Sequence, residues 1–431
     1  MNRSEEMFQK ALNYLPGGVS RDTVLRRPYP FYASRGRGCI VTDIEGREFV
    51  DFANNMASLI HGHAFQPIID AVSIQMQRGT CFTFGTESEI DFAEHMCSRS
   101  PAFEKIRFMN SGTEAVMAAI KAARAFTGRP KIAKVEGAYH GAYDYVEISQ
   151  TPGPDRWGPL DTPNAVPLAA GTPQGVSDDV IVIPFNNPEV ALHLLNRHAA
   201  SIAGVLVDPI PHRVGLIPAE HAFIRRLRDW TRIHGALLVF DEVITFRTEV
   251  GGAQIRYDVK PDLTALGKAI GGGFPVGAVA GSNDVMAVFA AGPHGLRLPQ
   301  SGTFSANPIT TTAGLVAMQY FGSDAVARIN RLGDLARASV SEAIAVSAIP
   351  ACVTGAGSMF RVHLQAEAPR NYREAFVGAR GKEQLARFVD GMLDAGIMLT
   401  NTGTGMLSTV MVQAQIDQLA DGVLTSLRGL T

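Results

Sequence analysis

The sequence predicts an α/β protein with a large, mostly parallel sheet and a smaller α+β domain. Between residues 71 and 315, strand-like apolar runs alternate with helical patterns, which is typical of a parallel sheet with crossover helices. Two of these runs, 202–207 and 237–240, are almost wholly apolar, as expected of strands buried on both faces. From about residue 325 long helical patterns are separated by short strands, which indicates the smaller domain.

The chain is expected to begin with a helix over residues 4–15, followed by short antiparallel strands between residues 31 and 52. We assign these strands to the smaller domain, so that the chain leaves that domain and later returns to it. The expected domains are residues 1–70 (N-terminal part of the small domain), 71–315 (large domain) and 316–431 (C-terminal small domain).

The composition excludes several classes of function. The 431 residues carry a formal net charge of −2, so no basic surface for nucleic acid or an acidic membrane is expected. The four cysteines are scattered without zinc or disulfide spacing, which favours a reduced, cytoplasmic protein. The start lacks the apolar segment of a signal peptide, and no run of about 18 apolar residues predicts a membrane span. His61 and His63 have no third ligand nearby, so we expect no metal site.

A turn of small residues opens the predicted helix at residues 114–127. Ser111, Gly112 and Thr113 expose backbone N–H groups at the positive end of the helix dipole, which suits a phosphate. The alternative is an ordinary capping box, because Ser111 and Glu114 have its spacing. On this turn alone the capping box is favoured.

The next predicted strand, residues 131–135, leads into Gly-Ala-Tyr-His-Gly. Tyr139 and His140 can lie flat against a planar ligand, because the flanking glycines let the backbone come close. The alternative is a solvated turn that carries an aromatic residue. Residues 150–178 are rich in Pro and Gly with little periodicity, which predicts a long loop over an active-site mouth.

The stretch from Asp241 to Lys268 predicts the chemistry. The apolar run before Asp241 indicates a buried strand with the acid at its carboxyl end, the edge of an open α/β sheet where ligands bind. Lys268 follows 27 residues later, between Gly267 and the glycines 271–273. Such an acid can hold a pyridine nitrogen protonated, and such a lysine can hold an aldehyde as an imine, or Schiff base.

Two other interpretations fit parts of this stretch. An apolar run ending in Asp-Glu also describes the Mg²⁺-binding strand of P-loop ATPases, but those proteins carry G-x-x-x-x-G-K-[ST] earlier in the chain. Here Lys268 comes later and is followed by Ala269, so the ATPase interpretation is poor. A lysine in a solvated loop stays open from this stretch alone, on equal terms with the imine.

The motifs form an ordered set. In sequence they are Ser-Gly-Thr opening a helix, G-x-Y-H-G, Asp-Pro after a strand, Asp-Glu-Val after a strand, a lysine 27 residues on, and S-G-T-F-x-x-N-P. In this order they resemble the class III aminotransferases, which are pyridoxal 5′-phosphate (PLP) enzymes of fold type I, the aspartate aminotransferase-like fold. The chain looks most like the glutamate-1-semialdehyde 2,1-aminomutase branch, which also contains similar enzymes acting on aromatic amino acids. The resemblance covers nearly the whole chain.

The resemblance implies a role for each motif residue. Lys268 would form the Schiff base with the cofactor and move a proton between substrate and cofactor. Asp241 would pair with the ring nitrogen, while Val243 and Tyr139 would pack on the two faces of the ring. Thr303 would reach the phosphate of the neighbouring subunit, which implies a homodimer with sites at the interface. The remaining expected cofactor-binding residues are Ser111, Gly112 and Thr113 at the phosphate, together with His140 and Asp208.

Three departures from the family pattern are visible. Asp208-Pro209 stands where the family usually has Glu-Pro, and D-E-V-I-T-F-R lacks the glycine before Phe246. The aminomutases carry a glutamate in a C-terminal loop, where this chain has residues 401–406 without an acid. This third departure argues against aminomutase activity.

Arg21 follows Pro-Gly-Gly-Val-Ser and lines up with an arginine that faces the substrate carboxylate in similar enzymes. A guanidinium matches a carboxylate with two parallel hydrogen bonds, so the chemistry is apt. Arg26 or Arg27 could serve instead, because the spacing in this loop varies. Residues 54–59 and the 150–178 loop are expected to set specificity.

The expected function is that of a PLP-dependent aminotransferase. It would move an amino group between an amino acid, or an amine resembling one, and an oxo acid by a ping-pong mechanism. Its partners would be these small molecules, without nucleic acid or membrane. Two alternatives stay open: intramolecular transfer by a 2,1-aminomutase, and a PLP-fold binding protein without turnover, which the intact Lys268 and Asp241 disfavour.

Overall fold

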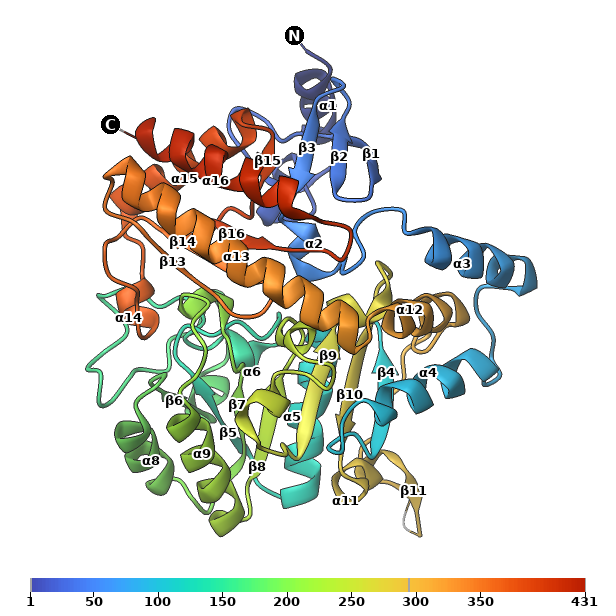
Figure 1. Ribbon diagram of the computed structural model, residues 1–431. Coiled ribbons are helices and arrows are strands. Elements are labelled where there is room, and N and C mark those ends of the chain that lie inside the picture. The colour runs from blue at the N-terminus through green and yellow to red at the C-terminus, as the bar shows by residue number, and fades with distance from the viewer. Residues whose placement is uncertain (1, 294, 431) are drawn as a thin grey trace.

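The computed structural model describes residues 2–293 and 295–430, and its largest feature is a seven-stranded sheet (Figure 1). The strand order is β4-β10-β9-β8-β7-β5-β6. The five strands from β9 to β6 are parallel, whereas β10 pairs antiparallel with both β9 and β4. The bounds are β4 (Lys105–Met109), β5 (Lys131–Val135), β6 (Val180–Ile183), β7 (Ile202–Val207), β8 (Leu237–Asp241), β9 (Leu263–Gly267) and β10 (Gly277–Gly281).

The reversal at β10 comes from a short connection. Residues 268–276 join β9 to β10 through one 3-10 turn, η5 (Lys268–Gly271), and this connection is too short for a crossover helix. The chain therefore returns antiparallel. Lys268 is left at the carboxyl end of β9, on the same edge where β7 and β8 deliver Asp208 and Asp241.

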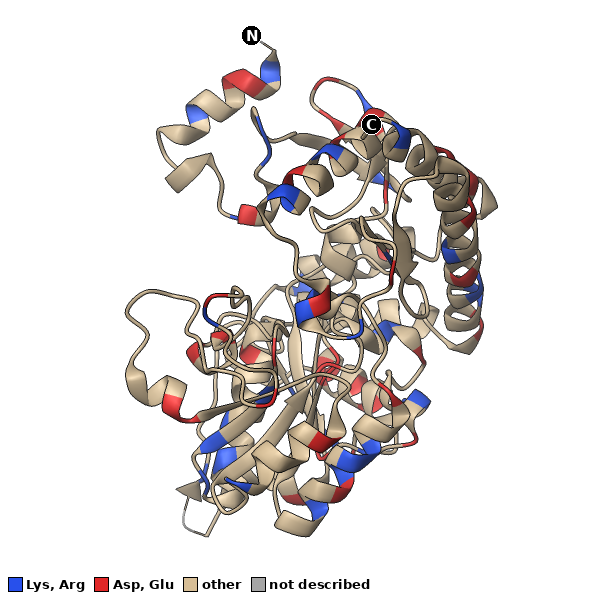
Figure 2. Ribbon diagram, turned by 90° about the vertical axis from the view of Figure 1, so that its left-hand side faces the viewer, with Lys and Arg blue, Asp and Glu red and all other residues tan. Residues whose placement is uncertain are grey.

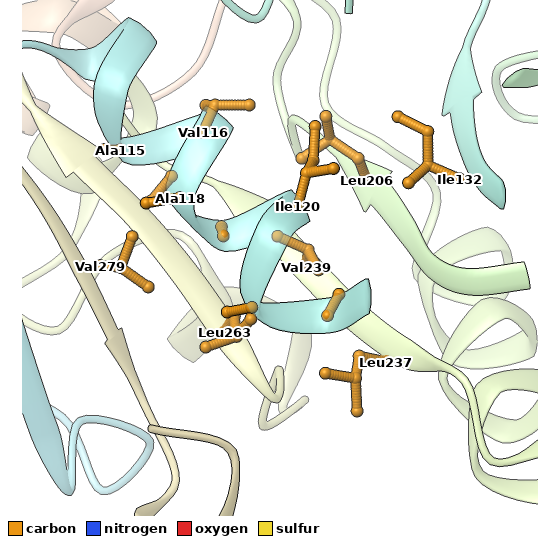
Figure 3. Close-up of a cluster of buried hydrophobic side chains, with 14 of the residues drawn as sticks. Ala115, Val116, Ala118, Ile120, Ile132, Leu206, Leu237, Val239, Leu263 and Val279 are labelled. Carbon is orange, nitrogen blue, oxygen red and sulfur yellow. The ribbon is translucent and has the colours of Figure 1, made fainter. Parts of the chain in front are cut away.

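Helices cover both faces of this sheet, with α5 (Gly112–Thr127) on one side and α8 (Pro188–Asn196) and α9 (His221–His234) on the other. Alternate residues of β8 point to opposite sides, so Val239 joins the core under α5 and Phe240 the core under α9. Figure 3 shows the α5 side, where Ile120 lies near Leu206 and Val239. Each such buried side chain contributes about 1.5–3 kcal/mol, so the core holds the functional edge in place.

The rest of the chain forms two smaller sheets. In the first, β1 (Ala33–Arg37), β2 (Ile40–Asp43) and β3 (Glu48–Asp51) are antiparallel, and β15 (Ile397–Met398) adds parallel to β3. The second is β13 (Cys352–Thr354), β14 (Met359–His363) and β16 (Thr404–Met406). The helices α13 (Ser323–Ser347), α15 (Ala379–Asp394) and α16 (Gln413–Arg428) gather beside them in the upper part of Figure 1. N-terminal strands thus pair with a C-terminal one.

The remaining helices are mostly short. Lys and Arg residues are mixed with Asp and Glu on the helices of Figure 2, which fits the small net charge. None of the helices among the described residues has the length and apolar character needed to cross a membrane. The bounds are α1 (Arg3–Leu12), α2 (Asn54–Ala57), α3 (Gln66–Arg78), α4 (Glu87–Ser98), α6 (Asp144–Glu147), α7 (Gln174–Asp178), α10 (Gln254–Tyr257), α11 (Asn283–Met286), α12 (Pro308–Tyr320) and α14 (Tyr372–Ala375), and β11 (Ala291–Gly292) pairs with β12 (Gly295–Leu296).

The segment 367–381 is ordered, although its sequence shows little periodicity. In the structure it contains α14, and Arg373 makes a bidentate ion pair with Glu136, with Nε–Oε2 and Nη2–Oε1 both 2.9 Å. The Tyr372 hydroxyl donates to the Pro152 carbonyl at 2.9 Å. Contacts with distant parts of the chain therefore order a segment whose local pattern is weak.

Candidate active site

A cavity of about 380 Å³ lies at the carboxyl edge of the large sheet. Residues from β8, the start of α5 and the turns after β5, β7 and β9 converge on it. Its walls are formed by Arg21, Asn55, Ser58, Asn110, Ser111, Gly112, Thr113, Val116, Tyr139, His140, Gly141, Asp208, Asp241, Val243, Ile244, Lys268, Gly273, Phe274, Pro275 and Val276.

Lys268 begins the turn after β9 with an unusual backbone. Its φ of 49° lies in the left-handed region, which costs a residue with a side chain on the order of 1 kcal/mol and is concentrated at functional sites. Burial lowers the pKa of Lys268, and the carboxylates of Asp241 and Asp208 oppose this shift. The amine is therefore more easily deprotonated than that of a surface lysine, although both acids lie near enough to act on it electrostatically.

Asp241 ends β8 with both oxygens engaged. Oδ1 accepts from the Val243 N–H at 3.0 Å, and Oδ2 lies 2.7 Å from Nδ1 of His140. Burial lowers the pKa of His140, although the hydrogen bond and the charge of Asp241 oppose the shift, so a neutral imidazole donates from Nδ1. Nε2 of His140 is buried without a partner. The imidazole thus fixes the orientation of the Asp241 carboxylate.

Asp208 follows β7, and its Oδ1 accepts from the Ile210 N–H at 2.9 Å. Burial first, and then the nearby Asp241, raise the pKa of Asp208 well above its usual range. Both effects favour the neutral form of Asp208, because a buried acid beside another acid is costly to ionise.

The turn before α5 serves two purposes at once. Ser111 is the N-cap, and its side chain accepts from the Glu114 N–H at 3.2 Å, as the capping interpretation expects. Gly112 and Thr113 nevertheless line the cavity, so the helix N-terminus also points at a ligand site. A Cβ on Gly112 would lie 2.8 Å from Cγ1 of Val243, so glycine is needed for the close approach.

Tyr139, which follows β5, and Val243, which follows β8, both line the cavity. The Tyr139 ring is half-buried and meets the His212 ring edge-on, with centroids 5.7 Å apart. The Arg213 guanidinium lies over the same ring, 4.6 Å from its centroid. These contacts hold an aromatic face ready for a planar ligand.

Arg21 is the one of the three candidate arginines that lines the cavity. Its Nη1 donates to Oδ1 of Asn55 at 3.0 Å, whereas Arg26 pairs with Asp390 at 3.4 Å, away from the site. Asn55 belongs to α2 (Asn54–Ala57), in which all four residues have positive φ. A left-handed turn of non-glycine residues is costly, so its position beside Arg21 points to a functional constraint.

One expectation is not met by this cavity. No part of the 150–178 loop lines it, and Trp157 in that loop packs instead on Tyr372 and Phe376. Thr303 is exposed and lies outside the walls of this cavity, and its expected reach into a neighbouring subunit stays a prediction. Phe274, Pro275 and Val276, which were not singled out from the sequence, reach the site because the turn after Lys268 doubles back.

The residues present fit pyridoxal 5′-phosphate. A helix N-terminus suits a phosphate, an aromatic face and a valine suit a planar ring, and an oriented acid suits a ring nitrogen. A lysine with a lowered pKa suits an aldehyde. These four features line one cavity.

Comparisons with known proteins agree with this geometry. The family model described as "Aminotransferase class-III" matches residues 23–428. Among curated relatives, a glutamate-1-semialdehyde 2,1-aminomutase of Methanothermobacter thermautotrophicus is 39% identical, covering 92% of this chain and 91% of the relative.

Among solved structures, an omega-transaminase from Sphaerobacter thermophilus is 44% identical with a TM-score of 0.95, covering 100% of this chain and 98% of that one. A β-phenylalanine aminotransferase from Variovorax paradoxus is 32% identical with a TM-score of 0.88, covering 99% and 94%.

Proposed function

The chain belongs to the class III aminotransferases, and we propose that it transfers an amino group between two separate molecules rather than within one. It is a PLP-dependent enzyme of fold type I, as the sequence predicts, and its likeness to the aminomutase branch is confirmed. In the proposal an amino acid, or an amine resembling one, gives its amino group to the cofactor. An oxo acid then takes the amino group away in the second half of a ping-pong cycle.

The observation that carries PLP-dependent amino transfer is the meeting of Lys268, Asp241 and the start of α5 in one cavity. When bound, the cofactor supplies an electron sink for the carbon that loses a proton. We assign Lys268 Nζ to the aldehyde and to proton transfer at that carbon, since burial lowers its pKa. Asp241, oriented by His140, is assigned to the ring nitrogen. The Gly112 and Thr113 N–H groups are assigned to the phosphate.

The substrate is proposed to carry a carboxylate that Arg21 binds. The Arg21 guanidinium lines the cavity, and its described partner is the neutral amide of Asn55 rather than an acid. It is therefore available to a carboxylate on the amino donor or the oxo acid. Residues Asn55 and Ser58 are proposed to shape specificity, because they line the same wall.

Transfer between molecules is favoured over the aminomutase reaction by the loop at residues 401–406. The loop has no acid, and the hydroxyls of Thr400, Thr402 and Thr404 bond to one another at 2.9 and 3.0 Å. The 44% identity to an omega-transaminase supports the same choice. The aminomutase stays the second candidate, because a relative with that name is 39% identical.

We further propose a cytoplasmic homodimer in which Thr303 reaches the partner's phosphate. Thr303 is exposed beside Phe304, whose exposed fraction is 59%. Exposed apolar residues also gather on α3, α4 and the segment between them: Ile69, Ile74, Met76, Phe82, Phe84 and Ile90. Such exposure favours a covered interface. The cytoplasmic location is supported by the four cysteines, which are all unpaired.

The test of transfer between molecules is dependence on an acceptor. A panel of α- and β-amino acids is mixed with the purified enzyme, and loss of the absorption band of the lysine-bound cofactor is recorded. We expect at least one donor to bleach the band and 2-oxoglutarate or pyruvate to restore it. Turnover of glutamate-1-semialdehyde alone, with no donor that needs an added oxo acid, would establish the aminomutase instead.

The dimer proposal is tested with mixed subunits. Thr303→Glu chains place a negative charge against the phosphate, and Lys268→Ala chains lack the amine. Each homodimer should be inactive, while hybrids of the two should recover one working site, made of Lys268 from one chain and Thr303 from the other. Hybrids without recovered activity would show that Thr303 does not act across an interface.

A further inference from the structure

A second cavity, of about 150 Å³, lies in the smaller part of the molecule between β14 and the start of α15. It shares no wall residue with the catalytic cavity. Its walls are formed by Arg361, Val362, His363, Leu364, Gln365, Phe376, Val377, Gly378, Gly381 and Leu385.

Arg361 is a buried cation with no counter-ion among the residues that the structure describes. Only 5% of the residue is exposed. Its Nη1 donates to the His212 carbonyl at 2.7 Å, and its Nε is buried with no partner. Burial lowers the pKa of Arg361 to about 10 with no carboxylate opposing it, so the guanidinium stays charged at neutral pH. Buried charges are normally paired, because the desolvation of a lone ion is costly.

The start of α15 brings a second positive group to the same cavity. This helix has 16 residues, its N-cap is Gly378, and no side chain caps it. No acidic residue lies in its first turn. The free N–H groups and the positive end of the helix dipole are therefore unbalanced at the wall that Gly378 and Gly381 form.

The rest of the wall is mainly apolar, with Leu364, Phe376 and Leu385 among its residues. His363 adds no charge, because burial and the nearby Arg361 lower its pKa to about 3. An anion that fits must therefore offer one charge to Arg361 and a hydrocarbon part to the wall. A compact dianion such as phosphate lacks the second feature and loses more hydration.

We propose that this cavity binds a small monocarboxylate with a short hydrocarbon chain, its carboxylate held by Arg361 and the N-terminus of α15. The site is separate from the Arg21 anchor of the catalytic cavity. It is connected to that cavity through the Arg361–His212 hydrogen bond, since the His212 ring contacts Tyr139.

The test uses the PLP-loaded enzyme with Arg21→Gln, so that the catalytic anchor does not add a second carboxylate site. Butyrate is titrated into it by calorimetry, and we expect saturable binding of one butyrate per chain. Adding Arg361→Met should weaken this binding at least tenfold. No saturable binding in the Arg21→Gln enzyme, or unchanged affinity after Arg361→Met, would overturn the proposal.

A second pair of variants tests the site while Arg361 itself stays in place, so that a structural effect of Arg361→Met cannot explain the result. A Cβ at Gly378 would meet no heavy atom within 4 Å, and the φ of −69° suits any residue. On the Arg21→Gln background, Gly378→Asp should cap α15, raise the melting temperature and fill the site with an internal carboxylate, weakening butyrate at least tenfold. Gly378→Asn caps without the charge and should weaken it less.

Two outcomes of these titrations count against the proposal. Equal butyrate affinity in the Gly378→Asp and Gly378→Asn variants would show that a negative charge in the cavity does not compete with the carboxylate. Inorganic phosphate that displaces butyrate at equal concentration would overturn the monocarboxylate class.

Discussion

Lys268 and Arg361 are both cationic side chains held away from solvent, and the chain treats them in opposite ways. Lys268 faces two acids, Asp241 and Asp208, which oppose the effect of burial on its pKa. Arg361 faces no acid in the described part of the chain, and burial alone lowers its pKa. The difference teaches that the charge of Lys268, which must gain and lose a proton, is balanced by acids of the chain itself. The charge of Arg361 has no such acid, and in our proposal a bound anion balances it.

Replacing each of the two acids near Lys268 is the first test of this comparison. Asp241→Asn should lower kcat/KM on the order of 10³-fold, because a neutral amide no longer stabilises a protonated ring nitrogen. Asp208→Asn should cost about tenfold or less, since burial and the nearby Asp241 raise the pKa of Asp208 and so favour its neutral form. Steady-state kinetics with cofactor content as the control decide this, and equal losses would contradict the assignment of the charge to Asp241.

The ion pair of Arg373 with Glu136 gives a reference for how much stability an arginine contributes when it does have a buried acidic partner. Arg373→Met leaves Glu136, whose side chain is 3% exposed, without its partner, and should lower the free energy of unfolding by about 3–5 kcal/mol. Arg361→Met loses the hydrogen bond to the His212 carbonyl but leaves no buried carboxylate without its partner, and it removes the cost of burying a lone charge. Without added carboxylate it should therefore change the free energy of unfolding by about 1 kcal/mol or less. Urea unfolding of the two variants measures both. An Arg361 variant destabilised as much as the Arg373 variant would mean that Arg361 is a structural residue.

Replacing Arg21 tests whether this arginine of the catalytic cavity binds the substrate carboxylate. Arg21→Ala should raise KM on the order of tenfold or more for amino donors with a carboxylate, because a charge-assisted hydrogen bond is worth about 1.5–3 kcal/mol. Simple amines should be little affected. A matched pair such as β-phenylalanine and 1-phenylethylamine allows the comparison, and equal changes in both would place the anchor elsewhere.

His363 gives the most gradual effect, a dependence of stability on pH. Its pKa is about 3 in the folded chain against an ordinary value of 6.5. The unfolded chain therefore binds a proton that the folded chain does not, so the stability that neutral His363 contributes is present above pH 6.5 and is lost as pH falls towards 3. The slope is at most about 1.4 kcal/mol per pH unit. Unfolding free energies of wild type and His363→Asn between pH 6.5 and 4.5 should converge as pH falls, and parallel curves would rule out this titration.

Much of the fold and of the site follows from local patterns in the sequence. The apolar runs before Asp208 and Asp241 predict buried strands, and a strand that ends on an acid places that acid at the binding edge. Gly112 and the glycines beside Lys268 mark the turns that face the same edge. The α/β fold class, the PLP cofactor and the aminotransferase family are confirmed.

Other features depend on contacts that no local pattern encodes. The loop at 150–178 has the composition of an active-site cover, yet Trp157 packs on Tyr372 and Phe376 instead. The cavity at Arg361 exists because a strand, a loop and a helix start meet, and only the folded chain shows that no acid comes with them. The domain limits, the residue roles and Thr303 at an interface stay predictions.

The central claim is that Lys268 holds the cofactor in a site that otherwise binds it through phosphate and ring contacts. The most direct measurement is the absorption spectrum of Lys268→Ala after loading with PLP and gel filtration. We predict that the variant retains the cofactor but loses the band of the lysine-bound form, along with turnover. A band unchanged from wild type would contradict the claim.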